Sequence, residues 1–292
     1  MMSLLRRTRI EAKSPDQVRA MRAAGLVVAR TLRLARGWAV AGTTTSEIDG
    51  RAERAIREAG ATPSFLGYHG FRGSLCISVN EEVVHGVPGS RVLADGDLVS
   101  IDCGAIVRGW HGDAALSLIV GGEDSESARA GDVAVMHDTE EAMWAGIRAL
   151  RAGGRLHEVG SAIEDAVLGS CRGRQEAGVP VTYGIVEDYV GHGIGTSMHM
   201  EPPVPNYAVH GKGPVVPVGA TVAIEPMVTL GGIDTTTLDD EWTVVTSDGA
   251  RAAHWEHTVA VTSAGLWVLT AEDGGAQQLG AAFAPLDAGL PR

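Results

Sequence analysis

Four acidic residues stand inside otherwise apolar, strand-like runs of this sequence. An ionised carboxylate is expensive in such a run unless it is paired or bound to a metal. In each run the acid shares its strand face with small or hydroxyl residues, while the other face is apolar. Such a pattern points to one common, roomy site. The four carboxylates expected to meet there are Asp102, Asp113, Glu225 and Glu256.

A glycine-rich stretch, residues 189–202, adds two histidines, His192 and His199. Glycines let the backbone approach a ligand closely. Four carboxylates and one imidazole make a ligand set for two divalent ions, and this oxygen-rich set suits Mn, Fe(II), Co or Zn. Two ions about 3.5–4 Å apart clamp a bridging hydroxide and lower its pKa, which gives hydrolysis at neutral pH.

Two of the acids fall in one predicted hairpin. Asp102 and Asp113 are symmetric about Val107-Arg108, so a turn there would place them about opposite each other. Like charges that face each other across a strand pair repel, and a divalent cation would turn this repulsion into attraction. An exposed hairpin with two solvated aspartates is the alternative.

The elements that must position these residues can be followed along the chain. Ser14 with Pro15 predicts a helix start, and Thr44 with Glu47 forms a capping-box signature. Strands are expected over about 75–120 and again from about 181, helices over about 131–150 and 157–171, and a loop over 202–220. A weak echo at an offset of 111 residues aligns the helical pattern after residue 41 with the one after residue 152, which suggests two related halves or a chance likeness between amphipathic helices.

Composition bounds the class of protein. The chain has 292 residues and a net charge of -12, which disfavours DNA and anionic membranes as partners. Residues 1–36 nevertheless carry nine Lys/Arg against Glu11 and Asp16, so a solvated basic helix or contact with ribosomal RNA is expected there. Three scattered cysteines, with no signal-peptide or membrane-span pattern, predict a cytoplasmic protein.

The candidate ligand residues lie within a series of short motifs, namely Asn80-Glu81, His85-Gly-Val-Pro88, Ile101-Asp-Cys-Gly104, Gly109-Trp-His-Gly-Asp113, Gly191-His-Gly-Ile-Gly195, His199-x-Glu-Pro202, Ile224-Glu-Pro-Met227 and Glu256-His-Thr-Val259. In the order and spacing of these motifs, over about residues 10–265, the sequence resembles the type I methionine aminopeptidases. The resemblance implies an α+β pita-bread fold, with two pseudo-symmetric α/β halves around a central curved antiparallel sheet. It also implies removal of the initiator methionine from nascent polypeptides with a small second residue.

The resemblance also assigns roles. The metal ligands would be Asp102, Asp113, His192, Glu225 and Glu256, with Glu225 doubling as a proton shuttle. His199 would hydrogen-bond the scissile carbonyl and its developing oxyanion, and His85 would orient the substrate amide. The pocket for the methionine side chain would draw on soft and aromatic groups, namely Phe65, Tyr68, Phe71, Cys76, Met198 and Trp242.

The sequence departs from the family pattern at a few positions. Met200 stands where a second acid is common, Phe65 where a cysteine is common, and Val84 where a cysteine usually precedes the histidine. These changes concern the size of the pocket and its substrate preference rather than metal binding. Alternatives are an Xaa-Pro aminopeptidase or prolidase of the same fold, and a non-catalytic ribosome-associated relative.

The expected organisation is a basic N-terminal extension over residues 1–13, one catalytic domain over 14–270 and a loose C-terminal tail over 271–292. The tail is expected because that stretch is rich in Gly, Ala and Gln. A monomer is expected.

Overall fold

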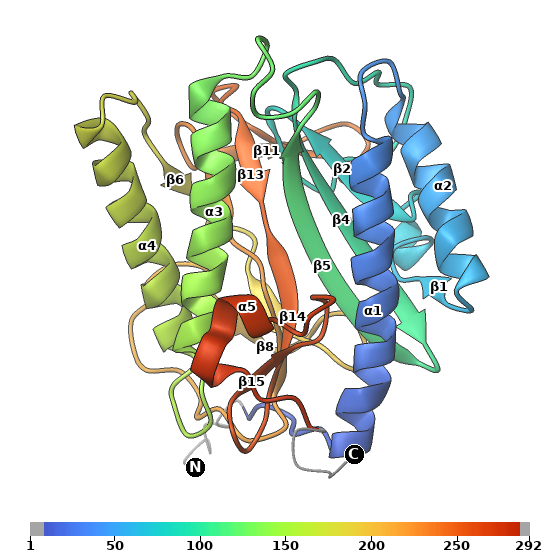
Figure 1. Cartoon of the computed structure of the whole chain (residues 1–292), viewed down its shortest axis with the longest axis vertical. Helices are drawn as coiled ribbons and strands as arrows, with labels where there is room; N and C mark the ends of the chain where they lie inside the picture. Colours follow the sequence, from blue (N-terminus) through green and yellow to red (C-terminus); the bar gives the residue numbers. More distant parts are fainter. Residues whose placement is uncertain (1–8, 287–292) are drawn as a thin grey trace, which may run out of the picture.

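The protein is described here by a computed structural model, which covers residues 9–286. Along the chain, a pair of helices followed by a series of strands occurs twice (Figure 1). The helices are α1 (Pro15–Trp38), α2 (Thr45–Glu58), α3 (Ala130–Ala149), α4 (His157–Glu176) and the short α5 (Ala276–Leu279), with 3₁₀ turns at Tyr68–Gly70 and Gly280–Ala282.

The strands of this part of the chain form one large sheet and two small ones, and every pairing between them is antiparallel. The nine-stranded sheet runs in the order β1-β4-β5-β14-β9-β7-β8, with β2 beside β4 and β15 beside β14. Its strands are β1 (Thr62–Pro63), β2 (Leu75–Val79), β4 (Leu98–Val107), β5 (Trp110–Ile119), β7 (Gly191–Gly193), β8 (Met200–Val204), β9 (Thr221–Ile224), β14 (Glu256–Val261) and β15 (Leu266–Val268). The small sheets are β13-β10-β6 and β11-β12-β3, from β3 (Glu82–Val84), β6 (Gly184–Ile185), β10 (Met227–Thr229), β11 (Thr235–Thr237), β12 (Val244–Thr246) and β13 (Ala252–His254).

The two predicted helix starts are confirmed. The Ser14 hydroxyl accepts a hydrogen bond from the backbone N–H of Gln17, whose side chain accepts one from the N–H of Ser14. Thr44 and Glu47 form the same reciprocal pair at the start of α2. Each box satisfies backbone donors that the first turn of a helix leaves unpaired, and so fixes where the helix begins.

Figure 1 shows α1 to α4 on one side of the curved sheet, in two pairs. The α1–α2 pair packs on β2, β4 and β5, while the α3–α4 pair packs on the half of the sheet that contains β9, β14 and β15. The echo at 111 residues coincides with this arrangement, because the positions it aligns are the buried faces of α2 and α4. These are Ile48, Ala52 and Ile56 in α2, and Val159, Ile163 and Val167 in α4.

Two glycines allow helix α1 to lie directly against its neighbours in the sheet. A Cβ on Gly112 of β5 would come within 2.7 Å of the backbone nitrogen of Gly25 in α1. A Cβ on Gly25 would in turn lie 2.1 Å from the carbonyl oxygen of Leu269. No side chain fits in these gaps, so both positions require glycine for the helix to dock at this depth.

The prediction of a loose C-terminal tail is wrong for residues 271–286. Leu279 is buried, and the N–H of Ala284 donates to the carbonyl oxygen of Leu266 at 2.9 Å. The Arg22 guanidinium on α1 also donates to the carbonyl oxygens of Ala271 and Glu272. Composition misled the prediction, since a few apolar anchors and two arginines, Arg22 and Arg33, hold a stretch that is otherwise Gly- and Ala-rich. Residues 287–292 of that predicted tail lie outside the described residues.

Two smaller differences concern the ends of elements. The loop predicted over 202–220 begins only at residue 205, because residues 202–204 belong to β8. Helix α4 continues to Glu176, beyond the predicted end at residue 171. Residues 1–8 of the predicted basic extension are outside the described part of the chain. Within residues 9–286, no helix combines the length and the apolar character that a membrane crossing needs.

Candidate active site

One side chain from each of five neighbouring strands converges on the same space. The strands are β4, β5, β14, β9 and β7, which follow one another across the large sheet. Each contributes one residue of the predicted ligand set, either within the strand or directly after it. In sheet order these residues are Asp102, Asp113, Glu256, Glu225 and His192.

The β4–β5 hairpin has a different register from the predicted one. Its turn is Arg108-Gly109, and Asp102 pairs with Ala115 rather than lying opposite Asp113. Both turn residues have positive φ, 52° and 79°, as a two-residue type I′ turn requires. The prediction centred the turn one residue too early, which shifted the pairing by two. Because a shift of two preserves the face, Asp102 and Asp113 still lie on the same side, as diagonal neighbours.

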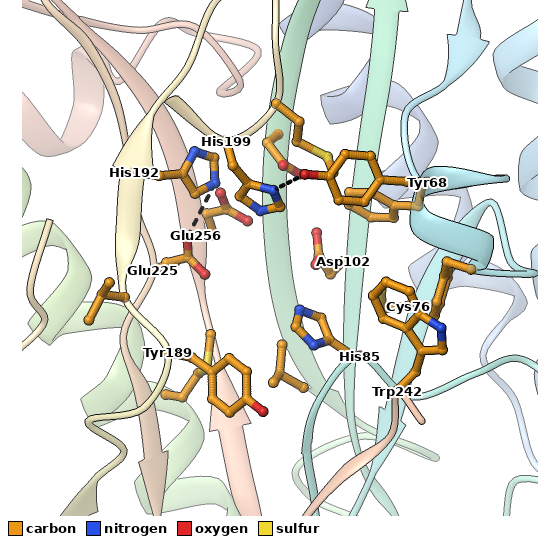
Figure 2. A pocket seen from close by; sticks show the side chains of 17 residues that line it. Tyr68, Cys76, His85, Asp102, Tyr189, His192, His199, Glu225, Trp242 and Glu256 are labelled. Atoms are coloured by element: carbon orange, nitrogen blue, oxygen red, sulfur yellow. Dashed lines mark hydrogen bonds and ion pairs between the residues drawn. The ribbon is translucent and has the colours of Figure 1, made fainter. Parts of the chain in front are cut away.

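Three of the five residues already form a compact group. Asp113, His192 and Glu256 are buried, and one ligand atom from each lies within 4.8 Å of the others. Nε2 of His192 also lies 3.5 Å from Oε1 of Glu225, as the dashed line in Figure 2 marks. The structure therefore brings together acids and an imidazole that are spread along the sequence from residue 102 to residue 256.

Burial gives these carboxylates unusual proton affinities. Desolvation raises the pKa of Asp102 to about 7. It raises the pKa of Asp113, Glu225 and Glu256 well above the usual range, and repulsion between neighbouring carboxylates adds to the shift. Groups that are this costly to ionise without a counter-charge are typical of functional sites.

The donor set fits a divalent metal. Three buried carboxylate oxygens, Oδ1 of Asp102, Oδ1 of Asp113 and Oε1 of Glu256, have no hydrogen-bond partner in the structure. Buried oxygens are normally satisfied, and a cation would satisfy these while offsetting the repulsion between them. We therefore regard the site as suited to hard or borderline divalent ions.

His192 is prepared to be a neutral nitrogen ligand. Its Nδ1 lies 3.0 Å from the carbonyl oxygen of Gly193, so the Nδ1–H donates there and leaves the Nε2 lone pair directed at the acids. Burial lowers the pKa of His192 to about 4, which keeps the ring uncharged at neutral pH. A backbone partner of this kind commonly fixes the tautomer of metal-binding histidines.

One cavity of about 140 Å³ is lined by the carboxylates on one side and by apolar groups on another. Phe65, Phe71, Cys76 and Met198 are buried side by side in its wall, with Tyr68 and Trp242 packed against them. All six residues of the predicted side-chain pocket therefore line one cavity, which the five ligand-type residues also line.

His85 and His199 lie in the same pocket (Figure 2). The ring of His199 lies 4.4 Å from that of His192, centroid to centroid, and its Nδ1 is 2.9 Å from the Tyr68 hydroxyl. His85 follows β3 with a positive φ of 60°, and burial lowers its pKa to about 4. Both rings are thus uncharged hydrogen-bonding groups that face the space between the carboxylates and the apolar wall.

The prediction missed several residues of the site. Tyr189 lines the pocket, with its ring edge-on to His85 at 5.4 Å, and Val84, Val190 and Met227 complete the lining. His254 is fully buried behind the site, and its Nε2 lies 3.9 Å from Oε2 of Glu225. Its position two residues before Glu256 was a usable signal, because residues two apart on an extended chain share a face.

Comparisons with known proteins agree with this geometry. Residues 19–263 match the profile of metallopeptidase family M24. Methionine aminopeptidase 1 of Mycobacterium tuberculosis is 50% identical over 262 residues, which make up 89% of this chain and 95% of that protein. Methionine aminopeptidase 1 of Bacillus subtilis is 43% identical over 261 residues, 89% of this chain and 99% of that protein.

Solved structures give the same result. The crystal structure of methionine aminopeptidase from Thermotoga maritima matches with a TM-score of 0.82 and 37% identity, over 90% of this chain and all of that one. A prolidase from Pyrococcus furiosus matches at 0.65 and 19% identity over 65% of its own length, a likeness of fold alone. The expected α+β pita-bread fold is confirmed. The chain belongs to metallopeptidase family M24 and, within it, to the type I methionine aminopeptidases.

Proposed function

We propose that this protein removes the initiator methionine from nascent polypeptides whose second residue is small, as a metal-dependent aminopeptidase. One observation carries the proposal: five ligand-type side chains, three of them buried, line a cavity that is also walled by aromatic and sulfur-bearing groups. The first half of this arrangement suits hydrolysis and the second suits a thioether side chain.

Two divalent ions would be held by Asp102, Asp113, His192, Glu225 and Glu256. Four carboxylates supply the negative charge that balances two such ions, and the unpartnered oxygens among them are the natural ligand atoms. Co, Mn, Fe or Zn fit the mixture of several oxygens and one nitrogen. When bound, the ions would acidify a water molecule so that it can attack a peptide carbonyl at neutral pH.

The remaining polar side chains would handle the substrate and its protons. Glu225 would accept a proton from the attacking water at a carboxylate oxygen and pass it to the departing amine. His199 would donate a hydrogen bond to the carbonyl oxygen as negative charge develops on it. His85 would orient the substrate amide. The methionine side chain would lie in the cavity lined by Phe65, Tyr68, Phe71, Cys76, Met198 and Trp242.

The experiment that tests this function uses metal-stripped protein titrated with Co(II) or Mn(II). Hydrolysis of Met-Ala-Ser is measured beside that of Ala-Pro-Ala, with Asp102→Ala as the control. We expect metal-dependent release of methionine from the first peptide alone. Cleavage of the proline peptide alone would move the protein to the prolidase branch of the fold, and turnover of neither peptide would favour a binding protein without catalysis.

We further propose a monomer in the cytoplasm with, at most, transient contact with the ribosome. The basic face of α1 supports that contact only in part, because two of its arginines serve the fold. Arg22 holds carbonyl groups of residues 268–272, and Arg33 pairs with Glu272 at 3.0 Å. Co-sedimentation with ribosomes at low and high salt, with and without residues 1–13, tests the proposal. Binding that survives the deletion would contradict a role for the basic extension.

A further inference from the structure

The turn before β12 is built around one carboxylate. Oδ1 of Asp240 accepts hydrogen bonds from the backbone N–H groups of Trp242, at 2.9 Å, and Thr243, at 2.8 Å. Oδ2 accepts a third bond from the hydroxyl of Thr243, at 2.6 Å. Glu241 within this turn has a positive φ of 66°, so the turn depends on these side-chain contacts for its shape. This turn places Trp242 in the wall of the pocket.

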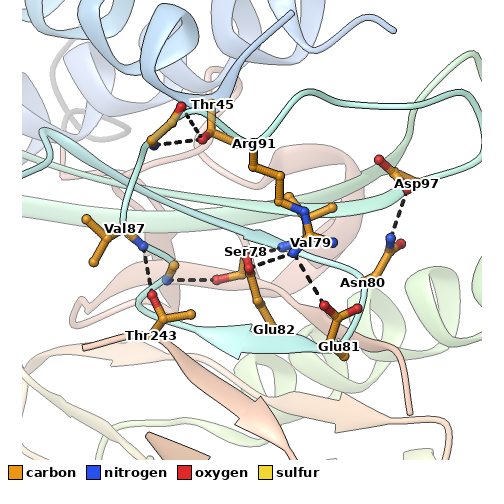
Figure 3. A network of polar contacts seen from close by, with 12 residues as sticks. Thr45, Ser78, Val79, Asn80, Glu81, Glu82, Val87, Arg91, Asp97 and Thr243 are labelled. Atoms are coloured by element: carbon orange, nitrogen blue, oxygen red, sulfur yellow. Dashed lines mark hydrogen bonds and ion pairs between the residues drawn. The ribbon is translucent and has the colours of Figure 1, made fainter. Parts of the chain in front are cut away.

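Thr243 connects this turn to the segment that carries His85. Its hydroxyl oxygen accepts a hydrogen bond from the backbone N–H of Val87 at 3.1 Å (Figure 3). The hydroxyl donates its single proton in the hydrogen bond to Asp240 and accepts the bond from the N–H of Val87 with a lone pair. Thr243 is buried, so a substitution that removes the hydroxyl breaks both bonds at a point enclosed by the protein.

The segment around His85 is held on both sides. Val84 before it pairs with Val244 of β12. Gly86 after it donates to the hydroxyl of Ser78, at 3.1 Å, and accepts from the N–H of Ile77, at 2.8 Å. His85 itself has a φ of 60°, a conformation that a non-glycine residue keeps only when its surroundings fix it. The bond from Val87 to Thr243 is therefore one of the restraints that maintain this conformation.

We propose that Thr243 is a positioning residue that couples the side-chain pocket to His85. The ring of Trp242 lies edge-on to Phe71 at 5.1 Å and to His85 at 6.1 Å, so both walls of the substrate site meet next to Thr243. Through its hydroxyl, one residue sets the turn that presents Trp242 and the backbone that presents His85. The inference rests on the proposed function, because it assigns Thr243 a part in recognising the same substrate.

The chain offers matched variants for the test. Thr243→Val removes the hydroxyl while keeping the shape of the side chain, and Thr243→Ser keeps the hydroxyl. Thr246→Val is the control, because Thr246 is another buried threonine of β12 whose hydroxyl donates to the carbonyl oxygen of Ala250, at 2.7 Å, away from the pocket. Asp240→Ala tests the same connection from its other end, because it removes all three acceptor contacts of the turn.

The first measurement is kcat and KM for Met-Ala-Ser. We expect Thr243→Val to lower kcat/KM about tenfold, with a raised KM and a lowered kcat, because the N–H of Val87 loses its acceptor and the turn at Asp240 loses one of its three bonds. Thr243→Ser and Thr246→Val should stay within about twofold of the parent protein. Should Thr243→Val fail to fold, Asp240→Ala is expected to show the same loss, and wild-type kinetics for it would then overturn the proposal.

The second measurement is the hydrogen-exchange rate of the Val87 amide, which does not depend on catalysis. Exchange should be faster by about tenfold or more in Thr243→Val and unchanged in Thr246→Val. Parent-like kinetics and exchange in Thr243→Val, or an equal loss in Thr243→Ser, would overturn the coupling. If the parent protein releases no methionine, the proposed function fails, while the Val87 exchange rates still test whether Thr243 holds the His85 segment.

Discussion

The phenol oxygen of Tyr68 lies 2.9 Å from Nδ1 of His199, and the direction of this hydrogen bond is tied to the tautomer of the His199 ring. With the phenol as donor, the imidazole proton stays on Nε2, which is the nitrogen a developing oxyanion needs as its donor. Burial lowers the pKa of His199, so the ring is neutral at pH 7 and its tautomer matters. Tyr68 therefore contributes more than one wall of the pocket.

Replacing Tyr68 with Phe tests this relationship. We expect Tyr68→Phe to lower kcat for Met-Ala-Ser about tenfold with a small change in KM, because the ring of His199 loses its orienting partner while the apolar wall remains. The reference is a double-mutant cycle with His199→Ala. Within that background Tyr68→Phe should have little further effect, and a full additional loss would show that Tyr68 acts independently of His199.

Metal binding should stabilise the fold through the buried acids. Because the ligands are brought together only in the folded chain, a divalent ion at 100 times its Kd should stabilise the parent protein by about 2.7 kcal/mol. The melting temperature of EDTA-stripped protein with increasing Mn(II) measures this. Asp113→Asn should remove most of the rise, since Asp113 belongs to the compact group with His192 and Glu256. An equal rise in the variant would place the ion elsewhere.

Much of this site could be predicted because its residues violate the hydrophobic pattern of their strands. Asp102, Asp113 and Glu256 each interrupt an apolar run, and a carboxylate in such a run needs a partner wherever the strand lies in the sheet. The alternation of faces was also readable, since it depends only on the two-residue period of an extended chain. Neither inference required knowledge of which strands are neighbours.

What could not be predicted depends on contacts between distant segments or on a single residue in a turn. The hairpin register depended on Arg108 adopting a positive φ beside Gly109, which its residue type does not signal. The packing of residues 271–286 depended on Arg22, about 250 positions away. His254 lies behind Glu225 only because β13 leads into β14 at that register.

The raised pKa of Asp102 predicts how the metal-free protein responds to pH. Its pKa is about 7 in the folded chain, against about 3.9 in an unfolded one, so the folded state binds more protons between these values. The stability of the metal-free protein should therefore fall, through this group, as pH rises from about 4 to 7, and change little above that.

The comparison that isolates Asp102 is the free energy of unfolding of the parent protein and Asp102→Asn, both stripped of metal, at several pH values. As pH rises from about 4 to 7, the free energy of unfolding of the variant should increase relative to that of the parent, and the difference should then stay constant. Loss of the Asp102 charge also relieves repulsion on Asp113, which acts in the same direction. A difference that does not vary with pH would mean that Asp102 titrates alike in both states.

The last prediction concerns the close approach of α1 to β5. Gly112→Ala should destabilise the protein by about 2 kcal/mol, because the new Cβ meets backbone atoms of Gly25 and Ala24 that cannot rotate away. The matched control is Gly173→Ala on α4, where a Cβ meets no atom within 4 Å and alanine favours the helix. Chemical denaturation measures both. Because Gly112 adjoins Asp113, a shift of α1 away from the sheet should also weaken Mn(II) binding in the first variant, whereas the control should bind as the parent does. Equal stability of the two variants would mean that α1 does not depend on this gap for its docking.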